Sequence, residues 1–452
     1  MAIQLSDHFS YARLLRFTFS SIVMMVFTSI YGVVDGFFVS NYVGKLQFAA
    51  VSFIVPYLML FGAIGFIFGT GGSALVAKIM GEGDREKANR VFSLIVYASI
   101  LCSMLCAAAG MLLIRPVAAA LGAEAELLEY AVLYGRIILT ASPAYALQVQ
   151  FQSFFVTAEK PQLGLRVTVL AGVVNMALDA LLIAVLQMGI VGAALATAVS
   201  QTAGGVVPLF YFFRPNTSLL RLGKTRFDPA VILRTCANGS SEFMSSISMS
   251  LVSMLYNIQL LRLSGEDGVA AYGVLMYINM IFISIFIGYS IGTAPLFSYH
   301  YGAANARELK NLLKKSFVII GAFSVAMFLS GELLARPLSR IFVSYDDELL
   351  QMTIHAFSIF AFSFLPAGMA VFGSSFFTAL NNGLVSAVIS FLRTVVFQAS
   401  AVLLLPLLWG LDGIWASTTA SEALAAAVCL IFIIALRKRY HYLGREESPA
   451  RE

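Results

Sequence analysis

Long runs of apolar residues, separated by short polar segments, fill almost the entire chain. Each run is close to or longer than the roughly 20 residues that a helix needs to cross the hydrocarbon core of a bilayer. The runs cover residues 13–39, 48–77, 91–114, 130–156, 163–186, 190–213, 231–261, 268–297, 314–335, 349–379, 384–408 and 412–436. We therefore predict an all-α polytopic membrane protein with twelve transmembrane helices.

Composition restricts the remaining possibilities. Of the 452 residues, 59% are hydrophobic and 12% are charged, which excludes a single soluble core. Twelve helices of about 25 residues leave about 150 residues for loops and tails, too few for a separate catalytic domain. The sequence shows no constellation of nucleophile, base and metal ligands, so we expect neither an enzyme nor a bound cofactor.

The basic residues indicate how the chain is oriented in the membrane. Alternate loops carry about 23 Lys and Arg residues on one side and about 6 on the other, and the richer side should face the cytoplasm. We therefore expect a multi-pass protein of the cell membrane with both termini in the cytoplasm. The net charge of +5 reflects this topology, and no clustered basic face suggests a nucleic-acid partner.

The two halves of the sequence match each other when shifted by about 221 positions. The matched residues include Gly44 and Gly265, Gly81 and Gly302, Arg115-Pro116 and Arg336-Pro337, and Gly189 and Gly410. Each half holds six helices, an even number, so the two units should be parallel repeats related by an axis along the membrane normal. We expect two pseudo-symmetric six-helix bundles in a monomer.

This repeat defines the predicted domain boundaries. The first bundle is 1–213, a cytoplasmic linker is 214–230, the second bundle is 231–437, and a cytoplasmic tail is 438–452. The linker is long enough to let the bundles move relative to each other, which suits alternating access to a cavity between them.

Two carboxylates in the first bundle are the strongest functional candidates, because an acid within the bilayer is costly and needs a reason. Counting from the helix ends places Asp35, Asp179 and Thr197 at a similar depth in the outer half of this bundle. Asn175 and Tyr31 lie one turn deeper, on the same helix faces as Asp179 and Asp35. If the three helices are neighbours, five oxygen-bearing side chains converge.

Such a cluster should bind a cation. Two carboxylates in a low-dielectric environment destabilise each other's charge, which favours uptake of a proton. An all-oxygen set also suits a hard cation, so Asp35, Asn175, Asp179 and Thr197 would be the ligands if the ion is sodium. A purely structural polar network is the alternative.

Three further charged residues lie deep in the second half. Arg393 and Glu422 belong to consecutive helices, which favours a structural ion pair. Glu242 has no obvious partner in the sequence and would line either the central cavity or the interior of the second bundle, where it would attract cationic substrates.

Several of these segments together resemble the multidrug and toxic compound extrusion (MATE) family over nearly the whole chain. The similar segments are Tyr31-Gly-Val-Val-Asp35-Gly36 and the paired inner loops Gly81-Glu-Gly-Asp-Arg-Glu-Lys and Tyr301-Gly-Ala-Ala-Asn305. Asn175, Asp179 and Thr197 resemble the first-bundle cation site of the branch typified by DNA-damage-inducible protein F.

The resemblance implies a secondary active antiporter that exports amphiphilic, often cationic compounds in exchange for inward protons or sodium ions. Some members of that branch have a proline in the first helix, whereas the first proline here is Pro56, so the resemblance does not extend to a switch at that position. Glu242 looks like the acid of other branches, which leaves open whether the first bundle, the second or both couple transport to the ion. The alternative function is a flippase for a lipid-linked precursor or lipid.

Overall fold

The computed structural model describes residues 3–343, 346–440 and 442, and within these residues the regular structure is helical, without strands. Most of the predicted tail 438–452 lies outside the described residues. The remaining chain alternates between long helices and short turns, as the apolar runs predict.

Six helical spans form the first bundle. They are α1 (Tyr11–Tyr42), α2 with η1 and α3 (Lys45–Phe66, Ile67–Gly71, Gly72–Gly81), α4 (Arg85–Ala120), α5 (Ala125–Thr157), α6 with η2 (Pro161–Leu178, Asp179–Val185) and α7 (Gly189–Phe213). Local sequence explains several of the starts: Ser10 and Asp84 cap α1 and α4 with their side chains, and Pro161 opens α6.

The second bundle repeats this order. It consists of α8 (Pro229–Gly302), α9 (Ala306–Val343), α10 and α11 (Asp347–Ala361, Phe364–Ala379), α12 with η3 and α13 (Gly383–Phe391, Leu392–Phe397, Gln398–Trp409), α14 (Leu411–Ala435) and the short α15 (Arg437–Tyr440). Two of its features differ from plain straight helices: α8 holds the first and second spans, and α10 and α11, which form the fourth, meet at an angle of 52°.

Every predicted span has a helical counterpart. Among the described residues, nine helices are long and apolar enough to cross a membrane, and the bent pair α10 and α11 makes ten. The 74-residue α8 turns back at Gly265, where φ is 66°, and so supplies two crossings. The 33-residue α5 completes the set of twelve. The predicted fold class is confirmed.

The repeat is visible at its turns. Gly44 and Gly265 both have a positive φ, and so do Gly189 and Gly410, each with φ of 57°. These left-handed conformations are easily adopted only by glycine, which explains why these positions match between the halves. The same turn geometry therefore recurs at the same place in each bundle.

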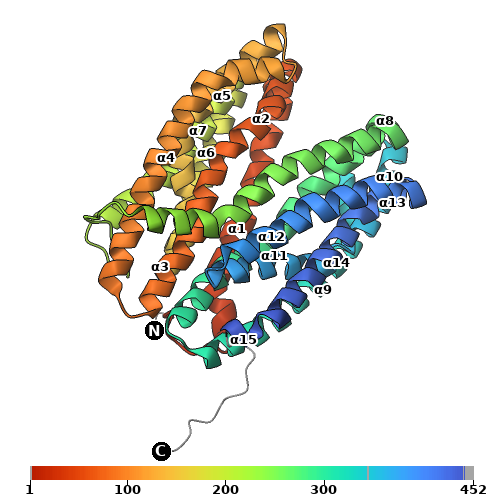
Figure 1. Ribbon diagram of the computed structural model, residues 1–452. Coiled ribbons are helices and arrows are strands. Elements are labelled where there is room, and N and C mark those ends of the chain that lie inside the picture. The colour runs from red at the N-terminus through yellow and green to blue at the C-terminus, as the bar shows by residue number, and fades with distance from the viewer. Residues whose placement is uncertain (1–2, 344–345, 441, 443–452) are drawn as a thin grey trace, which may run out of the picture.

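The two bundles are joined at the end of the molecule where α1 begins and α15 lies, and they diverge toward the other end (Figure 1). A single apolar core, with Phe92 and Phe154 from the first bundle and Phe297 and Phe376 from the second, fills the joined end. At the other end the core divides into one cluster in the first bundle and another in the second. We call these the terminus end and the far end.

The linker between the bundles is docked along α4. The Arg221 N–H donates to Asn89 Oδ1 at 2.7 Å, the Gly223 N–H donates to Ser93 Oγ at 3.0 Å, and Leu220 is fully buried. The hydrogen bonds of the linker fix the path of the chain from α7 to α8 across the terminus end.

Candidate functional site

Asp35 and Thr197 meet between α1 and α7. The Thr197 hydroxyl donates to Asp35 Oδ1 at 3.4 Å, although the two residues are 162 positions apart. Both side chains are partly buried, and both lie in the far-end half of the first bundle. The helices that carry them are neighbours, as the depth argument requires.

Asp179 and Asn175 lie next to this pair on the helix formed by α6 and η2. Asp179 is fully buried and begins the π-helical segment η2, while Asn175 is 3% exposed and lies one turn earlier. Asp35 interacts with both side chains. A π-helical turn inside an α-helix redirects the side chains around it, and such turns are frequent at functional sites.

Three oxygen atoms of this cluster lack a hydrogen-bond donor. Both carboxylate oxygens of Asp179 and the amide oxygen of Asn175 are buried without a partner. Leaving a buried charge uncompensated costs several kcal/mol, of the order of the penalty for breaking a buried ion pair. The arrangement is therefore one that a proton or a cation would stabilise.

Two tyrosines complete the surroundings. Tyr31 packs against Gly172 of α6 and also faces Gln148 and Tyr145 of α5, with Asp35 nearby. Tyr134 of α5 is buried and faces Thr197 and both carboxylates, a residue that the sequence did not single out. It lies within an apolar run, and only its polar hydroxyl could have indicated a role.

The ligand set is poor in the residues that bind transition metals. Among the described residues no group of three or more His, Cys, Asp and Glu side chains could hold a metal ion. The first-bundle cluster has two carboxylates, an amide and hydroxyl groups, all oxygen ligands. This chemistry fits a proton or a hard monovalent cation better than zinc or copper.

The second bundle lacks acids at the equivalent positions. A shift of 221 places Tyr256 opposite Asp35 and Thr418 opposite Thr197, and their hydroxyls form a 2.9 Å hydrogen bond in a buried position. The residues equivalent to Asp179 and Asn175 are Ser400 and Val396. The contact between the two helices persists, while the charge that would bind a cation does not.

Arg393 and Glu422 form a close ion pair in the second bundle. Arg393 Nη2 is 2.7 Å from Glu422 Oε1, and Arg393 Nε donates to both carboxylate oxygens at 3.0 and 2.9 Å. Their side chains are 20% and 8% exposed. Glu242 lies close enough to Arg393 for their charges to attract, so the three groups carry one negative charge in excess when all are ionised.

Comparison with known proteins identifies the family. The profile of the MatE family matches residues 20–181 and again residues 243–404, which together make up more than half of the chain. The chain belongs to the MatE family. Because the profile matches twice, at equal length, the internal repeat predicted from the sequence is confirmed.

Full-length relatives agree with this assignment. The chain is 23% identical to the multidrug export protein MepA of Staphylococcus haemolyticus strain JCSC1435, and 23% identical to that of Staphylococcus aureus strain MRSA252, with 94% of each chain covered in both cases. A crystal structure of a MATE protein in complex with MaL6 superposes with a TM-score of 0.89 at 22% identity, covering 96% of this chain and 98% of the other. The fold is therefore that of a MatE protein throughout.

Proposed function

We propose that this protein exports amphiphilic, often cationic compounds in exchange for inward-moving protons or sodium ions, by alternating access between its two bundles. Family membership and the names of the relatives support the export of drugs. The coupling role rests on one observation: Asp179, fully buried beside Asp35, has two carboxylate oxygens without a donor. A bound cation would supply the positive charge that these two oxygens lack.

The first bundle is the coupling bundle in this proposal. Only its far-end half carries the pair of acids, since Tyr256 and Ser400 stand at the equivalent positions of the second bundle. The second bundle instead has Arg393 already paired with Glu422, and the remaining carboxylate, Glu242, is suited to attract a cationic substrate.

Helix α1 connects the cation cluster to the other bundle. It carries Asp35, and nearby the Ser29 hydroxyl donates to the Met280 carbonyl of α8 at 3.1 Å. A methyl group added at Gly36 would contact the Tyr277 hydroxyl of α8 at 3.8 Å. A change in charge at Asp35 therefore acts on a helix that also packs against the second bundle, which allows ion binding to bias the relative position of the bundles.

The net charge moved in each exchange determines which driving forces can support a drug gradient. Exchanging one monovalent cation for one singly charged drug moves no net charge, so the membrane potential of about 2.3 kcal/mol per charge per 100 mV contributes nothing. Each tenfold drug gradient then costs about 1.4 kcal/mol, which the ion's own concentration gradient or a second ion must supply.

With both termini in the cytoplasm, the closed terminus end faces inward and the diverging far end faces outward (Figure 1). The arrangement then corresponds to the state in which ions enter and drugs leave. In this proposal the two moving bundles are residues 1–213 and 231–437, and residues 214–230 are the linker between them.

The test is transport of ethidium, an aromatic cation, by the purified protein in proteoliposomes with pH and sodium gradients imposed separately. Asp35→Asn should reduce gradient-driven transport at least about a hundredfold, because the amide cannot take up the coupling ion. Asp267→Asn makes the same change at an exposed residue near the far-end turn and should retain full activity. Full transport by the folded Asp35→Asn protein would contradict the proposal.

The same preparation tests the flippase alternative. A flippase for a lipid-linked precursor is expected to offer basic residues to phosphates, whereas the deep Arg393 is engaged by Glu422 through three hydrogen bonds. Movement of a fluorescent phospholipid between leaflets, without ethidium transport, would favour the flippase.

A further inference from the structure

Residues 3–10, which precede α1, form a strap across the terminus end. The backbone N–H of Leu5 donates to Glu159 Oε1 at 2.6 Å, in the turn between α5 and α6 of the first bundle. Leu5 and Phe9 are both fully buried, and the Phe9 ring packs edge-on against Phe17 of α1 with 5.9 Å between ring centroids. The strap is thus ordered by apolar burial in the core that the two bundles share.

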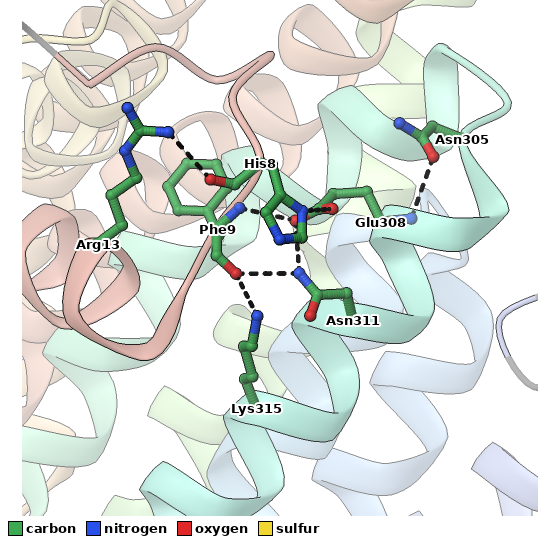
Figure 2. A network of polar contacts seen from close by, with 7 residues as sticks. All are labelled: His8, Phe9, Arg13, Asn305, Glu308, Asn311 and Lys315. Carbon is green, nitrogen blue, oxygen red and sulfur yellow. Dashed lines mark hydrogen bonds and ion pairs between the residues drawn. The ribbon is translucent and has the colours of Figure 1, made fainter.

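The other end of the strap is held by α9 of the second bundle (Figure 2). Glu308 receives the Phe9 N–H at 2.9 Å through Oε1, and His8 Nδ1 lies 2.6 Å from its Oε2. The Phe9 carbonyl accepts from Asn311 Nδ2 at 3.0 Å and from Lys315 Nζ at 2.5 Å. One short segment therefore makes four polar contacts with a helix of the opposite bundle.

The side chains of α9 are held in position to bind the backbone of the strap. The Glu308 side chain is only 7% exposed, and Asn311 Nδ2 donates to its Oε1 at 2.7 Å, which fixes the carboxylate for the Phe9 N–H. The Asn305 side chain accepts from the Glu308 N–H at the start of α9. Hydrogen bonds to charged groups of this kind are stronger than neutral ones, because the acceptor or donor carries a full charge.

The repeat reveals a second crossing of the same type. A shift of 221 places residues 3–10 opposite residues 224–231, at the end of the linker that docks on α4 before entering α8. The Thr225 hydroxyl donates to the Arg90 carbonyl of α4 at 2.9 Å. In both cases, a segment docked on the third span of one bundle leads directly into the first helix of the other bundle.

The two crossings differ in one respect that matters for movement. The linker is continuous with α7 and α8, so it cannot leave the interface completely. The strap leads into α1, and the contacts that attach it to α9 are all non-covalent. Separation of the bundles at the terminus end must therefore break the contacts of the strap with α9, or those with Glu159.

We propose that residues 3–10 are a latch that holds the terminus end of the two bundles closed and that its release from α9 accompanies opening of this end. The inference rests on the proposed alternating access. The latch contributes to the free-energy difference between the closed and open states of the terminus end. This contribution is separate from that of the cation cluster in the far-end half.

The test is the distance between spin labels at Lys87 and Lys310, exposed residues of the first and second bundles at the terminus end, in a variant without native cysteines in lipid nanodiscs. Removal of the first nine residues, or Glu308→Ala, should raise the ratio of open to closed molecules about tenfold, equivalent to about 1.4 kcal/mol. Glu86→Ala is the matched control, because Glu86 pairs with Arg90 of its own helix. Its ratio should stay within about twofold of the parent's.

An unchanged distance distribution in both the truncated protein and Glu308→Ala would overturn the latch, and so would an equal shift in Glu86→Ala. Because the measurement needs no substrate, its outcome is separate from the transport assay. A parent protein that transports ethidium but shows no shift on strap removal contradicts only the latch. A parent that never transports contradicts the proposed function, while a shift in the label distances still supports a latch between the bundles.

Discussion

At the scale of single residues, the two halves of the chain show how a duplicated site can diverge while its contact survives. The hydroxyl of Thr197 contacts the Asp35 carboxylate, and the hydroxyl of its equivalent, Thr418, contacts Tyr256. Identical threonines in equivalent places thus have different partners. Only the first has a charge whose state an ion can change.

This difference provides a prediction with an internal control. Thr197→Val should weaken cation binding about twofold to tenfold, because the loss of one hydroxyl interaction is worth about 0.5–1.5 kcal/mol. Thr418→Val removes an equivalent hydroxyl and should leave the cation affinity unchanged. Calorimetric titration of sodium, or proton release measured on sodium addition, compares the two variants. Equal losses would show that both bundles bind the ion.

Glu159 provides a prediction about pH. Burial raises the pKa of its carboxyl, and the neighbouring Asp7 acts in the same direction, against the opposing effects of the Leu5 N–H, Arg85 and Lys160. The folded protein therefore holds this proton more tightly than the unfolded chain does. The stability that this contributes is fully present below the ordinary pKa of about 4.3 and is lost as the pH rises through the raised pKa.

The measurement is the Tm of the parent and of Glu159→Gln in one detergent between pH 4 and pH 8. The parent should lose stability relative to the variant as the pH increases, because the glutamine has no proton to lose. A constant difference across this range would show that Glu159 does not contribute to the pH dependence.

At the scale of elements, apolar length alone predicted every transmembrane span, since a helix that crosses a bilayer needs a run of that length. Finer features depend on tertiary packing. The π-helical starts at Asp179 and Leu392, the break between Ala361 and Phe364, and the docking of Leu220 on α4 have no signal in the hydropathy pattern. Polar residues in apolar runs indicated Asp35, Asp179 and Thr197, but Tyr134 was hidden among other buried aromatic residues.

The ion pair of Arg393 and Glu422 connects η3 with α14. Replacing Arg393 alone with Met should lower the unfolding free energy by about 3–5 kcal/mol, because Glu422 would then remain as an unpaired buried charge. Replacing both residues with Met should recover most of that loss. Thermal unfolding in detergent compares the single and double variants, and equal destabilisation by both would contradict a purely electrostatic penalty.

At the scale of the whole molecule, two glycines let the backbones of α3 and α8 come into close contact at the terminus end. A methyl group added to Gly81 would collide with the Tyr299 carbonyl oxygen of α8, and one added to Gly302 would collide with the Lys78 carbonyl oxygen of α3. These two glycines are equivalent in the repeat. The helices therefore cross near the pseudo-symmetry axis at a distance that no larger residue allows.

Gly81→Val should force this end apart and shift the spin-label distances between Lys87 and Lys310 toward the open state. Gly321→Val is the control, because a methyl group added at Gly321 of α9 meets no atom within 4 Å. The control should keep the closed distribution. If both variants gave the same distances, steric exclusion at this crossing would not be what sets the closed state.

The division of the apolar core carries a consequence for how such a protein can change over generations. Residues of the two far-end clusters, for example Ile54 and Trp415, belong to separate cores, so their substitutions should affect stability additively. Substitutions at Phe92 and Phe297 share one core and should depend on each other. The two far-end clusters can thus change independently of each other, while the shared core keeps the two halves matched.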